Sequence, residues 1–338
     1  MLDLELLASF VHIINIYKTD KWDIKTMKKS LTVVFGIIAL CSILTVLLLL
    51  QPASPTSQDT LQPTPHTLQS AIGNATNFLE ETREPYTLLM LNVIYRRFGI
   101  TAFADALQHY DQVLAESPQE APLLRVFRRI ADYDNPLQAE DLQSVSVNLD
   151  RVTVPALYCD RLGLPGDYFV MLNNAASGAG GEYMLTHALL ATIWLQENGN
   201  GASLSVDFIK SLYSANAALI GDEPVVNDLE LEAAAFLYLA GQGALVDDAF
   251  VQYVIAAQNN DGGWLLSSDT PGNSTAHTTV LGLLLLLHVE FPADSYPPML
   301  ATASSHEGVS LNPTDYAFSV AAYFLLVPSS RRKIGNLA

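Results

Sequence analysis

The sequence predicts an all-α protein: an α/α toroid of about six helical hairpins, preceded by one transmembrane helix. Three observations support this prediction. Apolar residues recur at spacings of three and four from residue 67 onward, and no convincing run alternates in the manner of a strand. Similar segments repeat at an offset of 45 residues in the second half of the chain. One uninterrupted apolar run near the N-terminus is long enough to cross a bilayer.

The apolar run occupies residues 31–50, and only three hydroxyl side chains interrupt it. A helix of this length spans about 30 Å, the thickness of the hydrocarbon core. Five lysines precede the run, and no Lys or Arg follows it until Arg83. This bias predicts a single-pass anchor with a cytoplasmic N-terminus and a periplasmic or extracellular C-terminal domain. The rival, a cleavable signal peptide, is disfavoured because the run exceeds a typical h-region and no small-residue cleavage site follows it.

The remaining segments follow from composition. Residues 27–30 (Met-Lys-Lys-Ser) are typical of the start of a bacterial export signal, so we expect translation to begin at Met27. Four prolines among Ser, Thr and Gln predict an extended linker after the anchor. The predicted organisation is a cytoplasmic segment at 1–30, the anchor at 31–50, the linker at 51–66, the extracytoplasmic toroid domain at 67–330 and a basic tail at 331–338.

The charge of the chain restricts its partners. The net charge is −18, and Lys210 is the only basic residue between Leu162 and Ser330, against seventeen carboxylates. Nucleic acid is therefore excluded as a partner, because binding it requires clustered basic residues. The acidic surface either attracts a basic protein partner or simply keeps the domain soluble. Cys41 and Cys159 are the only cysteines, and Cys41 lies in the apolar run, so the domain holds no disulfide framework.

The internal repeat places three polar residues at equivalent positions. The segments LTHALLATIWL, ELEAAAFLYLA and TAHTTVLGLLL align at residues 185–195, 230–240 and 275–285. The alignment superposes His187, Glu232 and His277. Each segment is apolar all round, as a fully buried helix is, and amphipathic segments lie between them. Residues 68–330 leave room for a little under six such hairpins. They either close into a ring or form a linear solenoid, which would need polar ends that the apolar run at 316–327 does not provide.

The residues QNNDGGW, from Gln258 to Trp264, precede a Ser/Thr-rich loop and an apolar run that contains glycine. This pattern resembles the repeat of the terpenoid cyclases and protein prenyltransferases, and the likeness extends recognisably from residue 180 to 327. The resemblance implies an α/α toroid with a central cavity, in which Gln258 caps an adjacent helix and Trp264 covers the joint between hairpins. The Asp-x-Asp-Asp motif of the cyclases and the Asp-to-Cys spacing of the prenyltransferase zinc site are absent. The usual cyclase reaction is therefore not expected.

The starts of the buried helices are the candidate functional region, because in a toroid they meet at one rim and their dipoles act there. Two interpretations remain open. In one, His187, Glu232, His277 and Asp315 form a catalytic group, and His187, Glu232 and His277 bind zinc or act as acid and base. In the other, Thr186, Asp228, Thr275 and Thr314 cap helices and the histidines satisfy nearby polar groups. A further candidate, Cys159 with Asp160, would join the site from an earlier helix.

Three functions remain open on the sequence alone. The first is a membrane-anchored toroid that binds a ligand in its central cavity and processes it by metal-assisted or acid/base chemistry. The second is a non-catalytic scaffold of a membrane-associated complex, which would use the acidic surface. The third is a sugar-active hydrolase or lyase with a carboxylate pair drawn from Glu230, Glu232 and Asp315.

Overall fold

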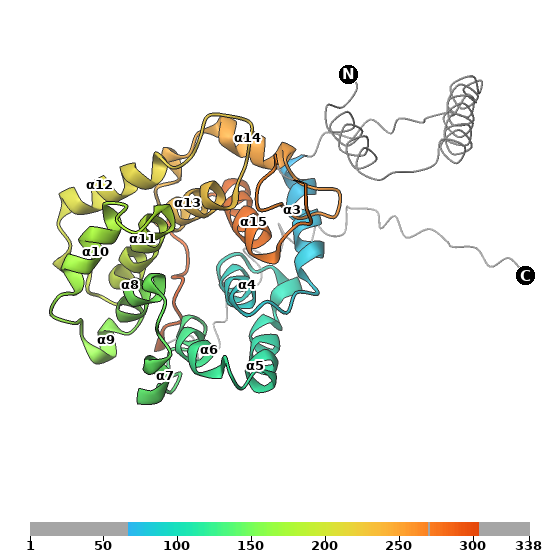
Figure 1. The fold of residues 1–338 in the computed structure, drawn as a ribbon. Helices are drawn as coiled ribbons and strands as arrows, with labels where there is room; N and C mark the ends of the chain where they lie inside the picture. Colours follow the sequence, from blue (N-terminus) through green and yellow to red (C-terminus); the bar gives the residue numbers. More distant parts are fainter. Residues whose placement is uncertain (1–66, 270, 304–338) are drawn as a thin grey trace, which may run out of the picture. The chain divides into compact units, whose positions relative to one another are not determined.

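A computed structural model describes residues 67–269 and 271–303 (Figure 1). These residues form thirteen α-helices, α3 to α15, four short 3-10 helices and no strand, so the all-α prediction is confirmed for the described part of the chain. No helix in that part is long and apolar enough to cross a membrane. The predicted anchor at 31–50, the linker at 51–66, the basic tail at 331–338 and Asp315 lie outside the described residues.

Thirteen α-helices follow one another along the described residues. Their bounds are α3 (Leu68–Leu79), α4 (Pro85–Phe98), α5 (Ala106–Glu116), α6 (Ala121–Phe127), α7 (Ala139–Gln143), α8 (Asn148–Leu157), α9 (Cys159–Leu162), α10 (Tyr168–Ala176), α11 (Glu182–Glu197), α12 (Val206–Ala217), α13 (Asp228–Leu239), α14 (Asp248–Ala256) and α15 (Ala276–Glu290).

The three helices of the repeat are buried on nearly every side, as their uniformly apolar sequences predict. Helices α11, α13 and α15 bury ten or more residues each, whereas α12 between them buries only Leu212 and Asn216. Helix α11 packs against α8 and α13, α13 packs against α15, and α15 packs against α3 and α4 (Figure 1). Equivalent positions of the repeat therefore lie on neighbouring buried helices.

The first half of the chain continues this row of buried helices. The rings of Tyr86 in α4 and Phe127 in α6 meet edge to face with centroids 5.6 Å apart. The Tyr158 hydroxyl, at the end of α8, donates a hydrogen bond of 2.8 Å to the carbonyl oxygen of Val126 in α6. Helix α4 also contacts α15. The first and last buried helices of the described chain thus pack against each other.

The QNNDGGW motif joins the last hairpin to the first helix. The Gln258 amide donates to the carbonyl oxygens of Ala71 in α3 (2.8 Å) and Gly262 (2.9 Å). The Trp264 indole is buried and donates to the Val254 carbonyl oxygen at 2.7 Å. A Cβ atom on Gly282 would lie 2.9 Å from the Trp264 ring, so glycine is needed there for the ring to fit. Trp264 is therefore buried between α14 and α15, which agrees with a structural role.

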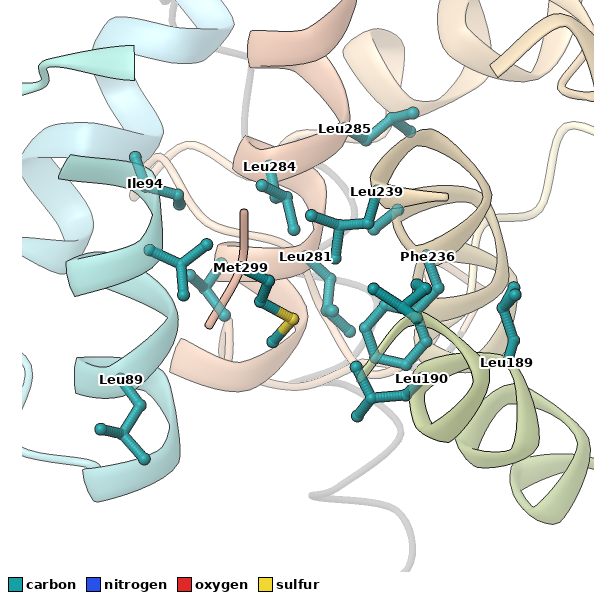
Figure 2. Close-up of a cluster of buried hydrophobic side chains, with 14 of the residues drawn as sticks. Leu89, Ile94, Leu189, Leu190, Phe236, Leu239, Leu281, Leu284, Leu285 and Met299 are labelled. Carbon is teal, nitrogen blue, oxygen red and sulfur yellow. The ribbon is translucent and has the colours of Figure 1, made fainter. Parts of the chain in front are cut away.

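The segment 297–301 inserts between the buried helices. Figure 2 shows Met299 among buried leucines of α4, α11, α13 and α15. The Trp194 indole of α11 lies 3.3 Å from the Met299 sulfur, and the Arg96 guanidinium of α4 donates to the Met299 carbonyl oxygen at 2.5 Å. The Glu197 carboxylate accepts the backbone N–H groups of Met299 and Leu300. This segment fills space between these helices.

Candidate metal centre at the starts of the buried helices

The starts of α13 and α15 are capped by residues other than Asp228. Asn227 is the N-cap of α13: its side chain accepts the Glu230 N–H, and the Glu230 carboxylate accepts the Asn227 N–H, at 3.0 and 3.1 Å. Thr275 caps α15, as predicted, by accepting the Thr278 N–H at 3.1 Å. The interpretation of Asp228 as a cap is therefore wrong, because the extended backbone of Asn227 places the cap one residue earlier.

Glu232 lies at the centre of the group, with only 2% of the residue exposed. Its Oε1 accepts a hydrogen bond from the Thr186 hydroxyl and lies 3.3 Å from Nδ1 of His187. Its Oε2 lies 3.6 Å from Nε2 of His277. The structure therefore brings together the three residues that the repeat superposes, and Thr186 acts here as a donor to the carboxylate instead of a helix cap.

Asp228 completes the group from the first turn of α13. Its Oδ1 accepts from the Thr278 hydroxyl at 2.5 Å, and its Oδ2 accepts from the Tyr183 hydroxyl at 3.0 Å. Nε2 of His277 lies 3.7 Å from the same Oδ2. The contact between Tyr183 and Asp228 was not predicted from the sequence. Tyr183 lies 45 residues before Asp228, so the repeat offset alone could have indicated it.

His187 contacts the Glu232 carboxylate but does not belong to the side chains whose donor atoms converge. Its Nδ1 lies 2.9 Å from the carbonyl oxygen of Tyr183 as well as 3.3 Å from Glu232. A carbonyl oxygen only accepts, so Nδ1 carries the hydrogen and cannot also bind a metal. The predicted ligand set of His187, Glu232 and His277 therefore overlaps in two residues with the donor atoms that converge in the described part of the chain. The donor atoms that lie within 4.8 Å of one another belong to Asp228, Glu232 and His277.

The geometry of this set fits a small divalent cation. Two ligand atoms that each lie about 2.1 Å from zinc at tetrahedral angles are about 3.4 Å apart. The distances from His277 Nε2 to the two carboxylates, 3.6 and 3.7 Å, are close to that value. The His277 side chain is 49% exposed, so the group opens to solvent on one side. Two carboxylates and one imidazole leave room for a further ligand, as open catalytic zinc sites do.

The charges of the group are coupled. Burial acts to raise the pKa of Glu232, but the neighbouring imidazoles of His187 and His277 and the hydrogen bond from Thr186 outweigh it and lower that pKa to about 2. The neighbouring carboxylate of Glu232 raises the pKa of His277, and the charge of Asp228 adds to the effect against the opposing influence of burial. Burial and the neighbouring Asp228 likewise raise the pKa of Tyr183. The imidazolium of His277 is thus the counter-charge of the two carboxylates in the absence of a metal.

Further carboxylates surround this end of the buried helices. The pKa of Tyr86 rises to about 12 through burial and through the charges of Asp150, Glu84 and Glu120. Burial raises the pKa of Asp150, and the nearby His187 opposes that rise. These acidic side chains belong to the starts of α4, α6 and α8. The region is therefore strongly acidic and favours cations.

The other sequence candidates lie elsewhere or have different partners. Cys159 is buried against the amide of Asn200 at 3.1 Å, and burial raises the pKa of its thiol. Asp160 pairs with Arg129 at 3.1 Å. The prediction that Cys159 and Asp160 join the site is wrong, because each is already held by a residue outside the group. The Glu230 carboxylate accepts two backbone N–H groups, from Gly221 and Asn227. These bonds hold it at the helix start, so it does not face Glu232 as the second member of a carboxylate pair.

Comparison with known proteins adds no relative from which a role could be transferred. No protein-family model, curated protein or solved structure matches this chain. The chemistry open to the site is therefore set by its own residues.

Proposed function

We propose that this protein is a membrane-anchored, extracytoplasmic enzyme whose helical domain binds a divalent cation, zinc by preference, through Asp228, Glu232 and His277. The observation that carries the proposal is the convergence of two buried carboxylates on one half-exposed imidazole. Two buried negative charges are costly unless cations compensate them. A divalent cation balances this pair more fully than the single positive charge of His277.

The residues around the three ligands fix their positions. Thr278 and Tyr183 hold the two oxygens of Asp228, and Thr186 and His187 hold Oε1 of Glu232, which leaves Oε2 toward His277. Such supporting contacts orient ligands and tune the metal. A bound divalent cation supplies Lewis acidity, which polarises a carbonyl or phosphoryl oxygen and lowers the pKa of a water molecule. The exposed side of His277 is where a substrate would approach.

We further propose that the helix pairs close into an α/α toroid. The contact of α15 with α4 and the contacts through α6 and α8 support closure. In a toroid the helix starts would lie together at one rim. The charges of Glu84, Glu120 and Asp150, which lie at three helix starts, all raise the pKa of Tyr86, and this supports such an arrangement. Because segment 297–301 fills space between the helices, the ligand site is assigned to this rim. Residues 31–50 are proposed to anchor the domain, and its acidic surface remains available to a basic partner.

Acid/base catalysis without a metal is the second candidate. The raised pKa of His277 beside the ionised Glu232 favours it, since a charged imidazole on an open side can donate a proton to a substrate. A metal ion and a proton compete for the Nε2 atom of His277. Binding of a metal should therefore release a proton from the purified protein near neutral pH, whereas the metal-free mechanism predicts no binding.

The experiment is a zinc titration of the purified full-length chain by calorimetry after dialysis against a chelator. Asp228→Asn and Glu232→Gln each remove one ligand charge at nearly constant volume and should abolish binding. Glu223→Gln removes an exposed carboxylate from the loop before α13 and is the matched control. Retention of zinc affinity in both ligand variants would refute the proposed metal site and leave acid/base catalysis or a scaffold function.

A further inference from the structure

An apolar groove lies among α7, the end of α8 and α9 with the residues that follow it. Its volume is about 340 Å³. Val154 and Tyr158, which line it, are buried, and Leu142 and Leu164 are partly exposed. Leu162 also lines the groove and is 59% exposed. Single exposed apolar side chains are common, but one that adjoins an apolar groove marks a surface suited to binding.

The groove lies at the end of α8 that points away from the proposed metal centre. The start of α8 is near that centre, because the charge of His187 acts on Asp150. The end of α8 lies beside the end of α11, where the Asn198 amide donates to the carbonyl oxygens of Ala156 and Leu157 at 2.9 and 3.2 Å. No residue of the metal centre lines the groove, so binding there is independent of the proposed function.

The described part of the chain ends close to this groove. The carbonyl oxygen of Ala301 accepts a hydrogen bond of 3.3 Å from the Arg129 guanidinium, and the same guanidinium donates to Asp160 of α9 at 3.1 Å. In sequence Asp160 lies between Tyr158 and Leu162, which both line the groove. A single guanidinium group therefore separates Ala301 from the helix that forms one wall of the groove.

The sequence after this point contains a candidate occupant. Residues 316–327 form an apolar run, YAFSVAAYFLLV, which Ser319 alone interrupts. A run of this length is too short to cross a bilayer, which needs about 20 residues, and is typical of a segment buried in protein or lying at a membrane surface. The connecting residues 302–315 span up to about 46 Å when extended, so the run reaches the groove. Such a tether gives an effective concentration on the order of millimolar, which favours this run over that of a second copy.

We propose that residues 316–327 dock into this groove of their own chain, with aromatic side chains of the run packed against Tyr158 and Leu162. The segment 297–301 is inserted between the buried helices and held at Ala301, so the run starts from a fixed point beside the groove. Docking removes the apolar surfaces of both the run and the groove from water. A second copy of the chain and the membrane surface are the competing partners of the run, and the experiments separate them.

The first test measures whether the run covers Leu162 in the full-length chain. The thiol of Leu162→Cys is labelled with a maleimide, and mass spectrometry gives the rate at that position. Adding Phe318→Asp and Phe324→Asp should raise the rate by about tenfold or more, because burial of one such ring shifts an equilibrium by that factor. Ser329→Asp, just after the run, should leave it unchanged, as should both sets of changes for Val206→Cys, a control position that is 66% exposed. Equal rates at position 162 with and without the two aspartates would overturn the proposal.

The second test identifies what the run contacts while its apolar character is kept. The photoreactive amino acid p-benzoylphenylalanine replaces Phe324 in the full-length chain, which is placed in phosphatidylcholine vesicles and irradiated at a low and a high protein concentration. We expect a cross-link within one chain to a peptide from residues 142–165, with the same yield at both concentrations. Cross-linked dimers, adducts with lipid or links to another part of the same chain, in place of that product, would overturn the proposal.

Discussion

Replacement of Glu232 by Gln should destabilise the domain strongly at pH 6 in the presence of a chelator. The carboxylate is buried and accepts from Thr186 while lying 3.3 and 3.6 Å from His187 and His277. Breaking a buried charge pair costs about 3 to 5 kcal/mol. Glutamine keeps the volume and one acceptor, so we expect a loss at the lower end of this range. For a domain of this size that lowers the melting temperature by about 6 to 12 °C.

The cost should depend on pH with a defined sign. The folded pKa of Glu232, about 2, lies below its ordinary value of 4.5, so its contribution is complete above about pH 4.5 and is lost as the pH falls toward 2. The pKa of His277 is raised above 6.5, so its contribution is complete below that pH and is lost as the pH rises through the raised value. The difference between wild type and Glu232→Gln should therefore peak near pH 5 to 6 (roughly, from these two limits).

The assay is urea unfolding followed by circular dichroism from pH 3 to 9, with chelator throughout. Glu223→Gln, which removes an exposed carboxylate, should follow the wild type within about 0.5 kcal/mol. A loss below about 1 kcal/mol in Glu232→Gln, or the same difference at every pH, would refute the coupling of Glu232 to the histidines.

Three other changes test separate parts of the structure. Trp264→Ala should cost about 3 to 5 kcal/mol in unfolding free energy, because the ring is buried against Gly282; an unchanged melting temperature would contradict its role at the joint. Met299→Ala should cost about 2 to 5 kcal/mol by urea titration, and a neutral result would show that segment 297–301 does not fill the core. His187→Gln should weaken zinc affinity by about 10- to 100-fold in calorimetry without abolishing it, as expected for a residue that supports a ligand; complete loss would restore His187 as a direct ligand.

The 45-residue repeat predicted the contact among His187, Glu232 and His277 because equivalent positions on packed, neighbouring helices lie side by side. It did not identify Asp228 as part of the site. An aspartate at a helix start has the sequence signature of a cap, and only the extended backbone of Asn227 shows that the cap lies one residue earlier. The proposed ligand role of Asp228 therefore depended on a backbone angle that composition does not encode.

The segment 297–301 also escaped prediction, for a different reason. It has no helical periodicity, and its position depends on Arg96 and Glu197, which are distant in sequence and hold its backbone through hydrogen bonds. The buried Nε2 of His288, which has no hydrogen-bond partner among the described residues, likewise emerged only from the packing around the ring.

The most direct test of the metal centre is the stoichiometry of zinc bound to the chelator-treated full-length protein, measured by calorimetry together with proton release. The proposed site predicts one zinc per chain, release of a proton near neutral pH and loss of binding in both Asp228→Asn and Glu232→Gln. A protein that binds no zinc, or that binds it equally well in those two variants, would contradict the assignment of Asp228, Glu232 and His277 as a metal site.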